Sequence, residues 1–68
     1  MTKSDWLKYK HECLAKACHN DELYYKVRNK LQTVYGYMLL QQDAKQEELI
    51  EVTESLVSVK KQIEDMLK

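Results

Sequence analysis

Two cysteines and two histidines near the N-terminus are the side chains of this sequence best suited to bind a metal ion. They are His11, Cys13, Cys18 and His19. Zinc sites usually combine such ligands at spacings such as Cys-x2-Cys with His-x3-His, which are absent here. On a helix, Cys13 and Cys18 point about 140° apart, so one tetrahedral ion would not reach both unless the helix broke. We therefore expect no metal site and two small cysteines that are buried or half-buried.

The segment from Cys13 to His19 has the sequence Cys-Leu-Ala-Lys-Ala-Cys-His. It is similar to the Cys-x-x-Cys-His haem attachment motif with a longer spacer, as in some multihaem c-type cytochromes. This resemblance is confined to the segment itself and implies covalent haem attachment outside the cytoplasm. The N-terminus, Met-Thr-Lys-Ser-Asp-Trp, has no apolar signal region behind it. We therefore expect no cofactor, a cytoplasmic location and reduced cysteines.

Groups suited to catalysis are few. No pair of carboxylates lies in an apolar context that would raise a pKa, and neither histidine has a nucleophile and an orienting acid at a fixed spacing. Helical bundles that bind metals through carboxylates use Glu-x-x-His pairs, which do not occur in this sequence. The glutamates at positions 47, 48, 51 and 54 indicate a solvated helix face. We expect a protein that is not an enzyme.

Charge is divided unevenly along the chain, although its formal sum is zero. Residues 1–30 carry seven Lys or Arg against four Asp or Glu, a net of +3, and residues 31–68 carry four against seven, a net of −3. Basic residues interleaved with tyrosines are typical of surfaces that follow a nucleic-acid backbone. The candidate residues for such a surface are Lys8, Lys10, Lys26, Arg28 and Lys30. Acidic neighbours dilute this patch, so nucleic-acid binding is the alternative hypothesis.

The elements that position these residues are predicted to be helices, because the chain has no Pro and one Gly. Apolar residues recur at alternating spacings of three and four, the period of a helix seam. The first seam consists of Tyr24, Val27, Leu31, Val34 and Met38. The second consists of Leu49, Val52, Leu56, Val59, Ile63 and Met66. Two matched seams separated by a polar segment predict an antiparallel helical hairpin.

We predict one helical domain over residues 1–68, with helices at about 4–18, 21–41 and 44–67. Thr2-x-x-Asp5 is a weak capping box, and Asn20 or Asp21 can cap the second helix. No Gly or Pro enforces the first break, so one long bent helix over 4–41 is the other possibility. Asp43 with Gln46 is a start signal for the third helix, which places the hairpin turn at residues 42–45.

The segment 34–40, Val-Tyr-Gly-Tyr-Met-Leu-Leu, is apolar nearly all round, which is typical of a helix with several neighbours. Gly36 lies inside it and indicates a close approach, a slight bend or merely a tolerated surface position. A chain of this length builds a small core, and oligomerisation is one way to supplement it. We therefore predict an all-α hairpin or three-helix bundle that forms an oligomer, a homodimer above all. The candidate partner-binding residues are Tyr35, Tyr37, Leu39 and Leu40.

These features favour a small protein-interaction module, such as an inhibitor, an adaptor or an antitoxin-like regulator, a class that includes phage-encoded proteins. That step rests on size and fold analogy. A structural or chaperone helix pair is a further alternative to the nucleic-acid-associated regulator. No apolar run approaches the roughly 20 residues of a bilayer span, so we expect no membrane partner. The sequence identifies neither the partner nor the source organism.

Overall fold

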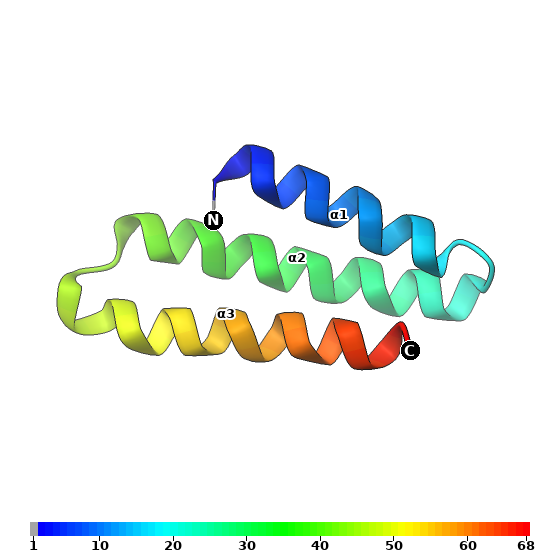
Figure 1. The fold of residues 1–68 in the computed structure, drawn as a ribbon. Helices are drawn as coiled ribbons and strands as arrows, with labels where there is room; N and C mark the ends of the chain where they lie inside the picture. The colour runs from blue at the N-terminus through cyan, green and yellow to red at the C-terminus, as the bar shows by residue number, and fades with distance from the viewer. Residues whose placement is uncertain (1) are drawn as a thin grey trace.

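The computed structural model describes residues 2–68 as three antiparallel helices lying side by side (Figure 1). Helix α1 covers Lys3–Ala17, α2 covers Asp21–Asp43 and α3 covers Gln46–Met66. No strand occurs among these residues. The prediction of an all-helical fold with three helices is confirmed.

Helix α1 begins at a reciprocal cap. The Thr2 hydroxyl accepts a hydrogen bond from the Asp5 backbone N–H at 3.2 Å, and the Asp5 carboxylate accepts one from the Thr2 N–H at 3.4 Å. These two bonds satisfy donors that the first helical turn leaves without partners. The bonds with Thr2 also hold the pKa of the Asp5 carboxyl below its ordinary value. This is the capping box that the Thr2-x-x-Asp5 spacing indicates.

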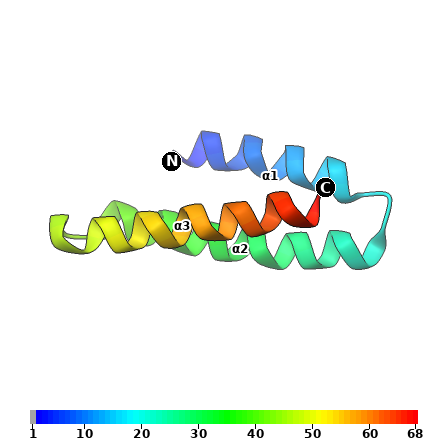
Figure 2. The ribbon, with the colours of Figure 1, turned by 60° about the horizontal axis from the view of Figure 1, so that its bottom comes forward.

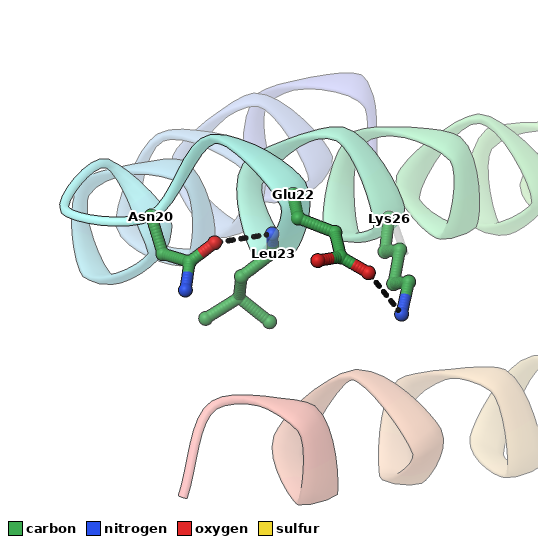
Figure 3. A network of polar contacts seen from close by, with 4 residues as sticks. All are labelled: Asn20, Glu22, Leu23 and Lys26. Carbon is green, nitrogen blue, oxygen red and sulfur yellow. Dashed lines mark hydrogen bonds and ion pairs between the residues drawn. The ribbon is translucent and has the colours of Figure 1, made fainter.

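A side-chain cap, rather than a glycine or a proline, makes the turn between α1 and α2. Asn20 has an extended backbone, and its side-chain oxygen accepts a hydrogen bond from the Leu23 N–H at 3.1 Å (Figure 3). An ion pair of 3.2 Å between Glu22 and Lys26 follows in the first turns of α2. The chain therefore turns at residues 18–20, and the alternative of one continuous helix over 4–41 is wrong.

The turn between α2 and α3 lies at Ala44 and Lys45, both of which have extended backbones. Asp43 is the last residue of α2, so the prediction that it starts α3 is wrong, and Lys45 takes the N-cap position without a side-chain hydrogen bond. Near this turn the side-chain amide of Gln41 donates to the Thr53 hydroxyl across the hairpin at 3.0 Å and joins α2 to α3.

The core lies mainly between α2 and α3. Its members are the two central seams together with three residues of α1: Val27, Leu31, Val34, Met38, Leu56, Val59, Ile63, Trp6, Cys13 and Ala17. The ends of the two seams are less buried than their centres. Tyr24 and Leu49 are exposed, although their spacing predicts that they are buried. Each stands near one end of its helix, so fewer neighbouring turns are available to cover it.

Gly36 lies on the outward side of α2. A Cβ atom built there would meet no atom within 4 Å, and the glycine has no positive φ. The predicted close approach at this position is therefore wrong within this chain, and the glycine is a surface position. The reason is that α1 and α3 pack on other sides of α2.

Replacing Gly36 by Ala should stabilise the fold, because Ala has higher helix propensity and meets no obstacle. We expect the free energy of unfolding to rise by about 1 kcal/mol, which corresponds to roughly 4–8 °C in Tm for a domain of this size. Gly36→Ser should give a smaller gain. Urea unfolding followed by circular dichroism measures both variants, and a loss of stability in Gly36→Ala would show that the glycine serves packing.

Candidate interaction surface

Tyr35 is held inside the chain by α1. Its ring lies 4.7 Å from the ring of Trp6, centroid to centroid, at a tilt of 53°. Lys10 places its ammonium group 5.1 Å from the centroid of the Trp6 ring on the same helix. Aromatic pairs of this geometry add to the stability gained from burial. Tyr35, one of the predicted partner-binding residues, is thus half-buried and anchors α1 on α2.

Tyr37 is also half-buried, on the side of α2 that faces α3. It lines a shallow hollow with side chains of α3, among them Ser55 and Val59. Tyr37 lies on the same side of α2 as Lys26 and Lys30, and α3 covers part of this side, so this predicted partner-binding residue is not freely exposed. The exposure of Tyr37 depends on where α3 packs around α2, and the helical period of the first seam does not determine that position.

Leu39 and Leu40 remain exposed, at 42% and 55% of their surfaces. Consecutive residues of a helix point about 100° apart, so the two leucines open onto different sides of α2. Leu40 follows Gly36 by one turn and shares its outward side. Leu39 follows Tyr35 by one turn. It therefore lies on the side of α2 that α1 covers at Tyr35, but past the N-terminal end of α1. The two predicted contact residues therefore belong to two neighbouring surfaces.

Three further apolar side chains are exposed on the first half of α3. Ile50 and Val57 are exposed over 68% and 60% of their surfaces, and Leu49 over 37%. Leu49 belongs to the end of the second seam, seven residues before the buried Leu56. Ile50 and Val57 are seven residues apart and so share one face of the helix. That spacing is visible in the sequence and could have identified them as contact residues.

Leu49 and Ile50 are exposed at the end of the hairpin that α1 does not reach, whereas Val57 lies level with α1 and is exposed on the outer side of α3. Helix α1 has 15 residues and α2 has 23, a difference of about 12 Å at 1.5 Å per residue. The short turn at residues 18–20 aligns α1 and α2 at one end, so the excess of α2 falls at the other. In both views the turn between α2 and α3 projects past the N-terminal end of α1 (Figures 1 and 2).

The projecting end, which we call the hairpin tip, comprises residues 39–53 and is acidic. It carries four Asp or Glu against one Lys, a net of −3. The last turn of α2 lies within it and contains Asp43 but no basic residue. A helix C-terminus carries a partial negative charge and favours a cation there. The hairpin tip therefore combines exposed apolar side chains with a negative field.

The basic residues of the predicted nucleic-acid surface do not form one patch. Side chains two positions apart on a helix point to nearly opposite sides. This separates Lys8 from Lys10, and Arg28 from both Lys26 and Lys30. Lys10 lies over the Trp6 ring, and Lys26 forms its ion pair with Glu22. The positive charge is thus spread around the end of the bundle opposite the hairpin tip.

The two cysteines lie in different environments. Cys13 is buried, and burial raises the pKa of its thiol. Cys18 is exposed at the C-terminal end of α1, where its thiol donates to the Ala15 carbonyl at 3.1 Å. The prediction that both are buried or half-buried is therefore wrong for Cys18. Among residues 2–68, no three or more His, Cys, Asp or Glu side chains are grouped so that they could hold a metal ion.

Burial leaves two polar atoms without hydrogen-bond partners in this part of the chain, the Trp6 ring nitrogen and the Tyr9 hydroxyl. Burial raises the pKa of the Tyr9 hydroxyl above its ordinary value, which keeps it protonated. A hollow of about 350 Å³ between α1 and α3 is lined by Tyr9, Cys13 and Glu64 among others. Both the phenol and the thiol in this hollow are biased toward their neutral forms, which makes them poor nucleophiles.

The chain matches no protein-family model, no curated protein and no solved structure. Within residues 2–68, no helix combines the length and the apolar character needed to cross a membrane.

The two thiols should react at different rates. In the native protein a thiol reagent should modify Cys18 rapidly and Cys13 only after unfolding, because Cys13 is buried and its thiol has a raised pKa. Absorbance of the released chromophore, with and without urea, measures both rates. The matched variants Cys18→Ala and Cys13→Ala assign the phases: the first should abolish the fast phase and the second should leave it unchanged. Equal rates in the native wild type would contradict the described packing of α1.

Proposed function

We propose that this chain is a non-enzymatic protein-interaction module that acts through its helical surfaces. Inhibitors, adaptors and antitoxin-like regulators, including phage-encoded ones, are the functional classes that fit. One observation carries the proposal: apolar side chains remain exposed together at the hairpin tip of a chain whose core is small. Exposed apolar clusters on small proteins are typical of surfaces that bind another protein.

We further propose that the chain binds a second copy of itself through the outward side of α2. Leu40 is exposed there, one turn after Gly36, and no part of the chain covers this side of α2 at Gly36. The opposite net charges of residues 1–30 and 31–68 favour an antiparallel pair, in which each basic half meets an acidic half. Leu39 lies at the edge of this contact.

Self-association provides the test. Sedimentation equilibrium of the wild type at tens of micromolar should give a dimer, and Leu40→Asp should weaken it about tenfold or more, because a charge replaces a leucine that the contact buries. Leu39→Asp should have a smaller effect. Val57→Asp is the matched control, since Val57 is also exposed but lies on α3, away from the outward side of α2. If the wild type stays monomeric at this concentration, the proposed homodimer is wrong.

The alternative, a nucleic-acid-associated regulator, predicts a different response to salt. Phosphate contacts release counterions, so binding that depends on them falls steeply as salt rises. Because the lysines and Arg28 spread around the bundle, we expect no retention on generic duplex DNA at physiological ionic strength. Fluorescence anisotropy with a labelled duplex measures this, and tight binding lost in Arg28→Ala with Lys30→Ala would favour the alternative.

A further inference from the structure

Tyr25 lies on the same outward side of α2 as Gly36 and Leu40. At 100° per residue, Tyr25 and Gly36 point within about 20° of one direction, and Leu40 points about 40° from Gly36. Tyr25 is exposed over 64% of its surface and Leu40 over 55%. The outward side of α2 therefore carries two large exposed side chains, one toward each end of the helix.

The stretch between these two side chains is exposed and uncharged. Asn29, Gln32 and Thr33 lie there, and all three are exposed. The nearest basic side chains, Lys26 and Arg28, point about 80° away from the direction of Gly36, toward the two flanks of this side. A helix laid on the middle of the outward side would thus bury no charged side chain, which is the costly event at an interface.

We propose that Tyr25 of each copy packs on Leu40 of the other copy in an antiparallel homodimer whose two-fold axis passes between Gln32 and Thr33. This inference rests on the proposed function and adds a contact residue and the register of the two helices. In a two-fold pair both copies use the same side and exchange the same contacts. Tyr25 and Leu40 are equally far from the proposed axis, so both contacts form at once, about 22 Å apart.

The side chains suit such a pair. Tyrosine is enriched at protein interfaces because its ring supplies a large, rigid contact area while its hydroxyl stays in water. Leucine offers an apolar surface on which that ring can lie. A single copy leaves both groups in solvent, and the antiparallel pair covers each of them with the other.

Charge favours the antiparallel direction. The hairpin tip has a net charge of −3, whereas residues 16–30 at the opposite end carry four Lys or Arg against two Asp or Glu, a net of +2. The antiparallel register places each tip beside the basic end of the other copy. A parallel pair would set two tips of like charge side by side, which suppresses association.

The ends of the contact each bring two carboxylates near each other. In the proposed register Glu22 of one copy comes level with Asp43 of the other. Lys26 forms its ion pair with Glu22 at 3.2 Å, so a cation already stands at this position. The same lysine also lies near the C-terminal end of the other α2, where the helix dipole favours positive charge.

Substitution of Tyr25 tests the contact. In sedimentation equilibrium, Tyr25→Ala should weaken the dimer about tenfold or more, because each dimer loses two contacts. Tyr25→Phe should retain the dimer, since the ring remains. The matched control is Tyr24→Ala, which removes the neighbouring ring but one that points about 100° away. Equal weakening by Tyr24→Ala and Tyr25→Ala, or no effect of Tyr25→Ala, would overturn the inference.

Cross-linking of whole chains tests the register. Asn29→Cys and Gly36→Cys are each made in a chain with Cys18→Ala, where the remaining Cys13 is buried. In the proposed register position 29 is level with position 36 of the other copy, so the two variants mixed and mildly oxidised should form a disulfide between different chains. Either variant alone should cross-link little, because its two cysteines lie roughly 10 Å apart along the helices.

The outcomes separate this inference from the proposed function. Efficient cross-linking of either variant alone, without the mixed product, would indicate a parallel pair and overturn the inference. A dimer that Leu40→Asp disrupts but Tyr25→Ala leaves intact would also overturn it, while the proposed homodimer stands. A wild type that stays monomeric at tens of micromolar would overturn both the homodimer and this inference.

Discussion

Side chains of α2 and α3 pack along two matched seams, and this contact determines what the rest of the chain can do. Val34 and Ile63 are fully buried in this contact. A hydrogen bond between the Gln41 and Thr53 side chains joins the two helices near the hairpin turn. Because the two helices differ little in length, the seam uses nearly all of both. Helix α1 then needs only to cover one side of a hairpin that is already formed.

The limited length of α1 links the fold to function. Its anchor is the contact of Trp6 with Tyr35, which lies near its N-terminal end. Beyond that contact α1 provides no cover, and the apolar side chains of the hairpin tip stay exposed among carboxylates. A longer α1 would have buried them and stabilised the chain further. The exposed tip thus follows from the difference in length between α1 and the hairpin.

Helical periodicity and composition predicted the number of helices, their central seams and two of their caps. The period did not show where neighbouring helices stand, so Tyr24 was expected in the core and Tyr37 was proposed as a contact although α3 partly covers it. Asp43 was misjudged because a local start signal does not determine where the preceding helix ends. The seven-residue spacing of Ile50 and Val57 puts them on one face of α3 outside its seam, but it does not show that no other helix covers that face.

Native-state hydrogen exchange of the backbone amides tests most directly whether the contact between α2 and α3 supports everything else. Amides around Leu31–Met38 and Leu56–Ile63 should exchange last, at the free energy of global unfolding, while those of α1 should open earlier. Residues 39–43 and 46–50 at the tip should exchange faster than the centres of their own helices. Amides of α1 that exchange as slowly as the centres of α2 and α3 would contradict the account, as would an α3 that opens before α1.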